Sequence, residues 1–310
     1  MPSPFEPSPI SAWIEPRRLE RAMRVLADPR LQPIRVGSPD AGARRALADR
    51  FGAEPFDDLR RLAVQSESAL WIDRAAPLDE ADIPALETED LGLVAGACSL
   101  PFLLSVPQCV TAPSFRRMAV GQTLLSIVEA FGRVEVFQAT VAVVDEDRFG
   151  EGMRIAASAA LAVLGPIDVV TALGARAGTI TATVVGERGF GTLAIGRGGD
   201  SCSFALVGEG GLATVTPTVA CWHRADGSLV EETRLEADGV EPTIGAILEA
   251  ERPSERRGTR PAPDEESRRM RLRAAALVET IALSARTGHS ESVETLLHGY
   301  GVDPRELRAK

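Results

Sequence analysis

The sequence predicts an α/β protein: a doubly wound parallel sheet followed by an α/β domain with a large, mostly antiparallel open sheet. Strand-like and helix-like segments alternate over roughly residues 8–115, which is typical of βαβ units. After residue 166, apolar segments follow one another through Gly-rich turns, which indicates hairpins. The 310 residues suit two domains, which we expect at residues 1–115 and 116–310.

The first region opens with a strand, a sharp turn and a helix. Leu19, Ala22, Met23 and Leu26 form one apolar stripe at helical spacing, and Pro16 stands where a first-turn proline is tolerated. The later segments are predicted as a strand in QPIRV, helices in SPDAGARRALADRFG and FDDLRRLAV, and strands in SALWI, LGLVAGAC and LLSVPQCV.

One uncharged segment, residues 91–115, is long enough to span a bilayer. It contains Pro101, Pro107 and Pro113, which would interrupt a helix repeatedly. We therefore expect two buried strands, because central parallel strands are continuous apolar runs. The N-terminus has no basic region followed by an apolar run, so we expect no signal peptide and a cytoplasmic protein.

The second region begins with an amphipathic helix in VGQTLLSIVEAFG and a long strand in RVEVFQATVAVV. The segment GEGMRIAASAALAVLG is apolar on almost every helical face, and we expect it to be buried. Strands are predicted in DVVTAL, GTITATVVG, GFGTLAIG, CSFALVG, GLATVTP and VACWHR. A last helix, from about Asp264 to Gly288, is predicted to pack back toward the first domain.

Composition narrows the possible functions. The net charge of −10 argues against a general nucleic-acid binder, which needs clustered cations. The only lysine is Lys310. The four cysteines lie far apart, without CxxC or CxxH spacing: Cys98, Cys109, Cys202 and Cys221. This predicts buried, reduced thiols and no zinc site.

The chain resembles the Gfo/Idh/MocA family of NAD(P)-dependent oxidoreductases, most strongly over residues 26–72. The segments SFRRMAVGQTLLSIVEAFGRV, GTLAIGRGGDSCSFALVGEGGLATV and SARTGHSESVETL are also similar to family segments. The resemblance implies a Rossmann domain, then an α/β domain whose open sheet often forms the oligomer interface.

The resemblance places the family's glycine-rich phosphate loop at residues 14–18. Here Glu15 adds a negative charge and Pro16 removes a backbone N–H, and neither suits a pyrophosphate. Arg17 and Arg18 are either guanidinium groups that hold an anion or solvated first-turn arginines, which is the commoner case.

Other positions also bear on ligand binding. The family's acidic ribose-binding residue corresponds to Ser38, which is compatible with the 2′-phosphate of NADP, and Asp73 is a further candidate contact of the cofactor. Arg116 and Arg117 correspond to a basic pair near the substrate cleft of many family members. They are expected either to hold an anionic ligand or to cap the domain junction.

The resemblance also implies catalytic positions, and the chain departs from them. The family's Glu-Lys-Pro motif corresponds to Ser99-Leu100-Pro101, and leucine can neither donate a proton nor polarise a hydroxyl. The family's Asp and His, four residues apart on a helix, correspond to Glu151 and Ile155. A general base with a pKa near neutrality is therefore missing from the expected place.

An acidic cluster, Asp145, Glu146, Asp147 and Glu151, is either a cation site or a solvated acidic loop. Metal-ligand spacing is absent, so we favour the loop and expect no metal.

Three hypotheses follow. The favoured one is a pseudoenzyme that binds no cofactor and acts as a binding, regulatory or structural subunit, in a homo-oligomer or with an active relative, through the C-terminal sheet. The first alternative is a divergent NAD(P)-dependent sugar or polyol oxidoreductase that uses NAD or NADP, with Glu151 or Asp73 as its acid–base. The second is a sensor of a small anionic metabolite held by Arg17, Arg18 or Arg116. No nucleic-acid or membrane partner is expected.

Overall fold

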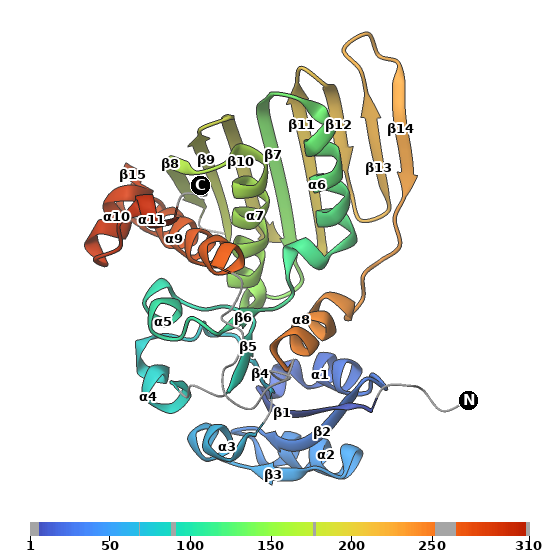
Figure 1. Ribbon diagram of the computed structural model, residues 1–310, viewed down its shortest axis with the longest axis vertical. Helices are drawn as coiled ribbons and strands as arrows, with labels where there is room; N and C mark the ends of the chain where they lie inside the picture. The colour runs from blue at the N-terminus through green and yellow to red at the C-terminus, as the bar shows by residue number, and fades with distance from the viewer. Residues whose placement is uncertain (1–5, 68, 88–90, 176–177, 252–264, 308–310) are drawn as a thin grey trace. The chain divides into compact units, whose positions relative to one another are not determined.

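The computed structural model describes residues 6–67, 69–87, 91–175, 178–251 and 265–307 (Figure 1). The chain forms two compact units, each with its own sheet. Unit 1 contains the chain up to Ser114 and a later segment that begins at Gly239, whereas unit 2 contains Phe115–Asp238 and the segment from Glu265 onward. The predicted division at residues 115 and 116 did not include this return of the chain to unit 1.

Unit 1 contains a six-stranded sheet in the order β3-β2-β1-β4-β5-β6, in which every neighbouring pair is parallel. Its strands are β1 (Ser8–Ile14), β2 (Leu31–Gly37), β3 (Glu54–Phe56), β4 (Ala69–Asp73), β5 (Gly92–Ala95) and β6 (Val110–Thr111). The prediction of a doubly wound parallel sheet is confirmed.

Helices α2, α3 and α5 of unit 1 begin where a short polar side chain caps them. Asp40 accepts a hydrogen bond from the Ala43 N–H at 2.7 Å at the start of α2, which ends at Gly52 with a φ of 64°. The helical segments are η1 (Pro16–Arg18), α1 (Leu19–Leu26), α2 (Ala41–Phe51), α3 (Leu59–Gln65), η2 (Glu80–Asp82), α4 (Ile83–Leu86), α5 (Leu100–Ser105) and α8 (Glu241–Glu251).

Helix α8 reaches unit 1 from the far end of the chain and was not predicted. It contacts β1, β4, β5 and β6. Ile244, Ala246 and Ile247 are buried in the same apolar core as Ile10 and Trp71. Helix α8 therefore completes the core of the parallel sheet, although it begins more than 160 residues after the end of β4.

The uncharged segment 91–115 contains β5, helix α5 and β6. The predicted strand LLSVPQCV, residues 103–110, is wrong except at Val110, because Ser99 and Pro101 begin a helix and β6 starts only at Val110. The Ser99 Oγ accepts a hydrogen bond from the Phe102 N–H at 3.3 Å, and the proline lies in the first turn. In the described residues, no helix has the length and apolar character to span a membrane.

Unit 2 contains a nine-stranded sheet in the order β14-β13-β12-β11-β7-β10-β9-β8-β15. Within this sheet, β7 and β10 are the only described strands that pair in parallel, which confirms that the sheet is mostly antiparallel. The strands are β7 (Val134–Val143), β8 (Ile167–Ala175), β9 (Thr179–Gly186), β10 (Gly189–Arg197), β11 (Ser201–Gly208), β12 (Gly211–Val215), β13 (Val219–His223), β14 (Leu229–Arg234) and β15 (Ser290–Ser292).

Helices α6, α7 and α9 pack on one face of this sheet (Figure 1). Helix α7 is buried on almost every side, as predicted, and Ala156, Ala157, Ala159 and Ala160 have no exposed surface. The helical segments of unit 2 are η3 (Phe115–Arg117), α6 (Ala119–Phe131), η4 (Glu146–Arg148), α7 (Phe149–Leu164), α9 (Glu265–Thr287), α10 (Val293–Gly299) and α11 (Pro304–Leu307).

Candidate functional site

The strand order of unit 1 reverses between β1 and β4, since β2 and β3 lie on one side of β1 and β5 and β6 on the other side of β4. In open α/β sheets, ligands bind at the carboxyl ends of the strands at such a reversal. Glu15 directly follows β1 and Asp73 ends β4, so both residues lie at the carboxyl ends of the two strands where a ligand would bind.

The turn after β1 is closed by its own hydrogen bonds. The Glu15 N–H donates to the Asp73 carbonyl at 3.0 Å, and the Arg18 N–H donates to the Glu15 carbonyl at 2.9 Å. The Glu15 carboxylate accepts from the Ala75 N–H at 2.7 Å. Pro16 has no N–H. The Glu15 and Arg18 N–H groups are therefore used within the chain, whereas a phosphate loop directs such donors at its ligand.

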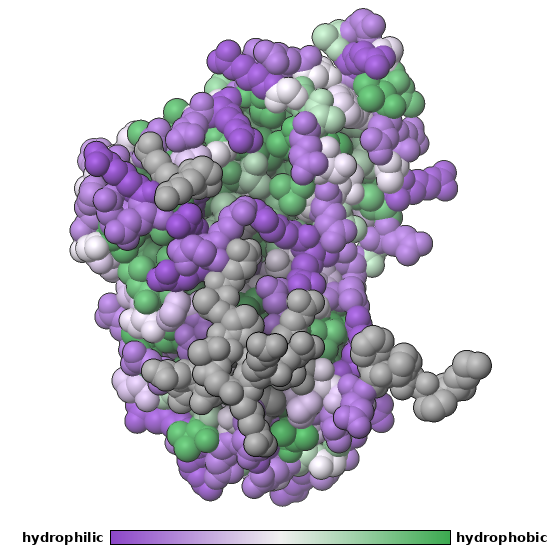
Figure 2. Space-filling model, in the orientation of Figure 1, coloured by the Kyte–Doolittle hydropathy of each residue, from purple (hydrophilic) through white to green (hydrophobic). Residues whose placement is uncertain are grey.

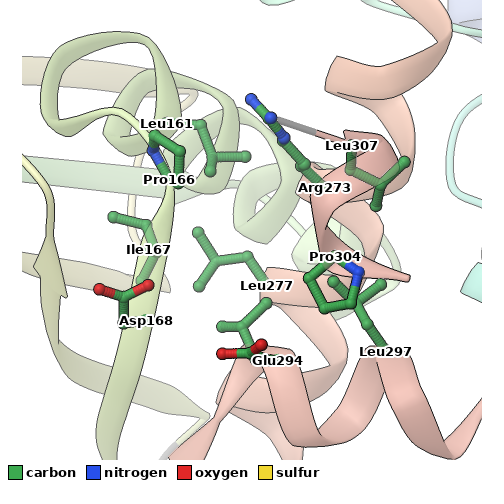
Figure 3. Close-up of a pocket in the computed structure, with 11 residues that line it drawn as sticks. Leu161, Pro166, Ile167, Asp168, Arg273, Leu277, Glu294, Leu297, Pro304 and Leu307 are labelled. Atoms are coloured by element: carbon green, nitrogen blue, oxygen red, sulfur yellow. The ribbon is translucent and has the colours of Figure 1, made fainter. Parts of the chain in front are cut away.

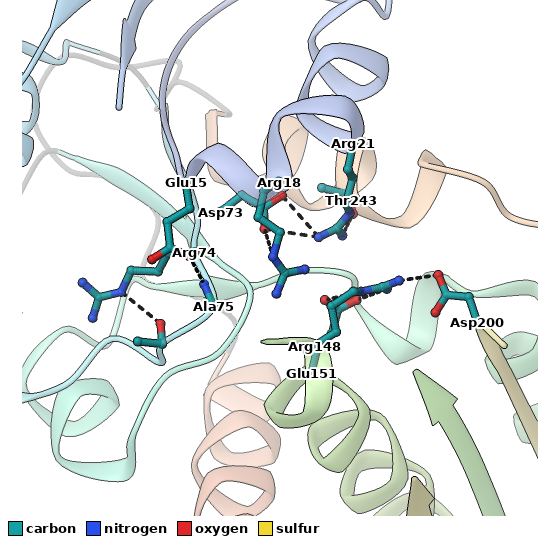
Figure 4. A network of polar contacts seen from close by, with 11 residues as sticks. Glu15, Arg18, Arg21, Asp73, Arg74, Ala75, Arg148, Glu151, Asp200 and Thr243 are labelled. Carbon is teal, nitrogen blue, oxygen red and sulfur yellow. Dashed lines mark hydrogen bonds and ion pairs between the residues drawn. The ribbon is translucent and has the colours of Figure 1, made fainter. Parts of the chain in front are cut away.

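A buried ion-pair network lies beside this turn (Figure 4). Asp73 is only 2% exposed, and the Arg21 guanidinium lies 3.3 and 3.4 Å from its two carboxylate oxygens. The Arg18 Nε is 4.0 Å from the same carboxylate. Arg21 also donates to the hydroxyl of Thr243, in α8, at 3.1 Å. We call Arg18, Arg21, Asp73 and Thr243 the Asp73 network.

The two arginines predicted at this turn differ in their surroundings. Arg17 is exposed, whereas Arg18 is 7% exposed and lies near Asp73. The expectation of two solvated arginines is therefore wrong for Arg18. No local pattern predicts that Arg18 approaches a carboxylate 55 positions away, because only the strand order brings the two together.

The polar groups of Ser38, the other candidate cofactor contact, take part in local structure. Its hydroxyl accepts from the Asp40 N–H at 3.3 Å, and its carbonyl accepts from the Arg44 guanidinium at 2.8 Å. Next to it, Gly37 packs on the Trp13 ring so closely that an added Cβ would lie 2.4 Å from a ring carbon. The end of β2 is therefore filled by Trp13 and by hydrogen bonds within the chain.

The positions that correspond to the family's Glu-Lys pair have structural roles. The Ser99 hydroxyl caps α5, and Leu100 has no exposed surface. A buried leucine contributes packing and no acid–base group. In unit 2, Ile155 is likewise buried in α7, with 6% exposed.

Glu151 is buried, with 4% exposed, and forms an ion pair with Arg148 (Figure 4). The Arg148 Nη2 lies 2.7 Å from one carboxylate oxygen, and Nε lies 3.3 Å from the other. Arg148 also donates to Asp200. Burial opposes the charge of Arg148, but the hydrogen bonds and charges of Glu151 and Asp200 outweigh burial and raise the pKa of Arg148.

Two members of the acidic cluster at the start of α7 form ion pairs with arginine. Glu146 pairs with Arg197, and Glu151 pairs with Arg148. Among the described residues, no group of three His, Cys, Asp or Glu side chains is placed to hold a metal ion.

Arg116, predicted at the ligand cleft, is half exposed and lies 3.5 Å from Glu266, and Arg117 is exposed.

A pocket in unit 2 lies among α7, β8, α9, α10 and α11 (Figure 3). Apolar side chains such as Leu161, Ile167 and Leu277 form most of its lining. None of the residues predicted as catalytic, cofactor-binding or ligand-binding lines this pocket, so it does not bring those residues together.

The open face of the nine-stranded sheet carries an apolar row. Register aligns eight side chains in neighbouring strands: Val169, Val185, Phe190, Val136, Val207, Leu212, His223 and Leu229. Six of them are large apolar residues with at least 39% of their surface exposed in the described chain. The adjacent row is uncharged as far as β13: Thr171, Thr183, Thr192, Gln138, Ala205, Thr214 and Cys221. We call these two rows the open-sheet surface.

The helix-covered side of unit 2 has a different character. There, hydrophilic and hydrophobic residues are interspersed on the surface (Figure 2). A continuous exposed apolar row of the kind found on the open-sheet surface is typical of interaction sites.

Several solved structures that are similar in fold to this chain are oxidoreductases. An oxidoreductase from Thermotoga maritima has a TM-score of 0.70 and 14% identity, with 94% of this chain and 100% of that chain covered. One from Agrobacterium radiobacter, solved with NAD+, L-tartaric acid and magnesium, has a TM-score of 0.72 and 14% identity, with 93% and 99% covered. The chain has the fold of Gfo/Idh/MocA-type oxidoreductases.

A third structure with this fold is the WlbA dehydrogenase of Bordetella pertussis, in complex with NADH and UDP-GlcNAcA. Its TM-score is 0.66 at 17% identity, with 93% of this chain and 99% of that chain covered. No protein-family model matches the sequence, and no curated protein is similar to it. Identities of this size show a shared fold and leave activity to be argued from the site.

The residues at the carboxyl edge of unit 1 do not fit a dinucleotide. A pyrophosphate at the turn would meet the Glu15 carboxylate and a proline where it needs N–H donors. Arg18, which is buried, and Arg21, which is partly buried, both lie against Asp73. Sequence reasoning identified Glu15, Pro16 and Asp73 but missed Arg21 and Thr243, which are 222 positions apart.

Proposed function

We propose that this chain has the fold of Gfo/Idh/MocA-type oxidoreductases without NAD(P) binding or hydride transfer, and that it acts as a binding, regulatory or structural subunit. The observation that carries the proposal is the Asp73 network together with the closed turn at Glu15. A cofactor would have to displace a buried ion pair, and separating such a pair leaves uncompensated charge in the interior.

The missing acid–base groups support the same proposal. Leu100 and Ile155, at the corresponding family positions, are buried apolar side chains. The only lysine is Lys310, and the three histidines all follow α7 in the sequence: His223, His289 and His298. Arginine is a poor substitute, because it stays protonated at any ordinary pH.

The open-sheet surface supports the subunit role. Its row of exposed valine, leucine and phenylalanine side chains would gain free energy by leaving water. We propose that it pairs with the same surface of a second copy, or with an active relative of the same fold. The two rows carry no Asp, Glu, Lys or Arg from β8 to β13, which suits self-association because no like charges are brought together there.

Thermal unfolding with added cofactor tests the proposal. We expect NAD, NADP and NADH, each up to about 1 mM, to leave the melting temperature unchanged, because only a ligand of the native state raises it. Saturable stabilisation at micromolar cofactor would overturn the proposal. Stabilisation by phosphate or a sugar acid alone would instead favour an anion sensor.

A divergent oxidoreductase is the second candidate, and the fold neighbours solved with NAD+ or NADH favour it. Asp73 or Glu151 would then serve as the acid–base, after losing its arginine partner. Oxidation of a polyol that depends on added NAD or NADP, abolished by either Asp73→Asn or Glu151→Gln, would decide for this candidate.

A further inference from the structure

Two cysteines of unit 1 lie close enough to react with each other. The Sγ atoms of Cys98 and Cys109 are 3.6 Å apart. A disulfide has an S–S length of about 2.05 Å, so bonding requires an approach of roughly 1.5 Å, which is within reach of side-chain rotation. The two residues bracket helix α5, since Cys98 lies between β5 and α5 and Cys109 lies between α5 and β6.

The backbone holds both cysteines in place. Leu78, which is fully buried, donates its N–H to the Ala97 carbonyl at 2.9 Å and accepts from the Ser99 N–H at 2.8 Å, so both neighbours of Cys98 are fixed. The Cys109 N–H donates to the Val106 carbonyl at 3.1 Å. The closeness of the sulfur atoms therefore follows from ordered backbone on both sides of α5.

The two thiols differ in access to solvent. Cys98 is partly exposed, whereas Cys109 has no exposed surface. The expectation that all four cysteines are buried is wrong for Cys98 and Cys221, which are both partly exposed. A reagent from solution meets Cys98 first, and Cys109 lies behind it as a second thiol.

We propose that Cys98 and Cys109 are a redox modification site, which a low-molecular-weight disulfide such as glutathione disulfide converts to a reversible intramolecular disulfide. The bond closes a loop of residues 98–109 and ties together the two ends of α5. It restricts local opening of this segment, because a cross-link removes conformations from the opened state. The inference is independent of the proposed function.

The reaction balances in two exchanges. The Cys98 thiolate attacks one sulfur of glutathione disulfide, which forms a mixed disulfide and releases one glutathione thiolate. The Cys109 thiolate then attacks the Cys98 sulfur and releases the second glutathione. The two protein thiols lose two electrons and two protons, and the glutathione disulfide gains them as two thiols.

Unit 2 supplies an internal control. Cys202 lies on β11 and Cys221 on β13, with β12 between them. They also face opposite sides of the sheet. Cys221 is aligned with Thr214 of β12, which is aligned with Ala205 of β11. Ala205 and Cys202 are an odd number of residues apart on the same strand, so their side chains point to opposite faces. Burial raises the pKa of Cys202 to about 12, with the charges of Asp238 and Asp200 adding to the effect. This pair is unable to form a disulfide without unfolding.

Peptide mass spectrometry after oxidation tests the proposal on the full chain. No lysine or arginine lies between Arg74 and Arg116, so one tryptic peptide, 75–116, carries both proposed cysteines, and another, 198–224, carries the control pair. After incubation with glutathione disulfide and alkylation in denaturant, we expect peptide 75–116 to be about 2 Da lighter and to take up no alkyl groups. Dithiothreitol should restore two alkylation sites, and peptide 198–224 should show no internal disulfide throughout.

Single substitutions separate the role of Cys98, which reacts first with glutathione disulfide, from that of Cys109, which completes the disulfide. Cys109→Ser should stop the reaction at a stable glutathione adduct on Cys98, whereas Cys98→Ser should leave Cys109 unmodified in the folded chain. Cys221→Ser is the matched control and should behave as the native chain at Cys98 and Cys109. Oxidation should also raise the melting temperature by several degrees in the native chain only. A persistent adduct on Cys98 of the native chain, or an equal disulfide yield in the control peptide, would overturn the proposal.

Discussion

The carboxyl edge of the parallel sheet in unit 1 and the open-sheet surface of unit 2 carry opposite patterns. At the first, charged side chains turn toward one another, and Asp73 is only 2% exposed among its arginines. At the second, apolar side chains such as Phe190 are 48% exposed. Ion pairs within the chain hold the charged side chains of unit 1, whereas the apolar row of unit 2 is exposed in the described chain. The contrast supports the proposal that side chains fill the cofactor edge and that the open-sheet surface binds a partner.

The largest expected effect is at Asp73. Asp73→Ala leaves Arg18 and Arg21 without their buried counter-charge, and we expect the free energy of unfolding to fall by about 3–5 kcal/mol in urea denaturation. The matched control is Asp57→Ala, which removes an exposed partner of Arg61 and should cost under about 1 kcal/mol. Equal losses in the two variants would mean that the Asp73 network does not hold this edge together.

The second effect tests the open-sheet surface. Phe190→Asp places a charge in the middle of the apolar row, and we expect it to weaken self-association by about 2–4 kcal/mol, measured by analytical ultracentrifugation. Val64→Asp is the control, because Val64 is 77% exposed and belongs to helix α3 of unit 1 rather than to this sheet. A native chain that is monomeric at high concentration, and that pairs with no relative of the same fold, would contradict the subunit role.

The third effect tests how tightly Trp13 packs against Gly37 at the carboxyl end of β2. Gly37→Ala would bring a Cβ within 2.4 Å of the Trp13 ring, so we expect a loss of about 1–3 kcal/mol and altered tryptophan fluorescence. Gly199→Ala meets no atom within 4 Å and should be nearly neutral. A neutral Gly37→Ala would show that Trp13 moves easily and that this end of β2 is open to a ligand.

The smallest effect concerns a surface counterpart of the Asp73 network. The side-chain hydrogen bond from Arg30 lowers the pKa of Asp28 below its ordinary value of 3.8. The stabilisation is therefore present above pH 3.8 and is lost as the pH falls through the lower pKa of the folded state. Asp28→Asn should cost under about 1 kcal/mol at neutral pH, with the difference disappearing in acid. A difference that persists at pH 2 would point to packing rather than charge.

Periodicity in the sequence was enough to predict much of the fold. The apolar stripe of α1, the buried α7 and the Gly-rich hairpins of unit 2 follow from local patterns, and all are present. Helix α8 was missed because its place in unit 1 depends on contacts with distant strands. Helix α5 was mistaken for a strand because the cap at Ser99 was not recognised within an apolar run.

The candidate site could be predicted from the sequence only where the identity of one residue is enough to include or exclude a function. Leucine at position 100 and proline at position 16 can be interpreted directly, since neither side chain can do what the family requires there. The pairing of Arg21 with Asp73 and Thr243 depends on topology, which places three separate segments at one strand end. The same holds for the sulfur atoms of Cys98 and Cys109, which the strand pairing of β5 and β6 brings together.

Direct titration of the native chain with NADH, followed by nucleotide fluorescence and calorimetry, tests the central claim that side chains of this protein occupy the place of the cofactor. We predict no saturable binding up to about 1 mM, a concentration at which most enzymes of this kind are close to saturation. Saturable binding with a dissociation constant in the micromolar range, weakened by salt and by a charge placed at Gly37, would contradict it.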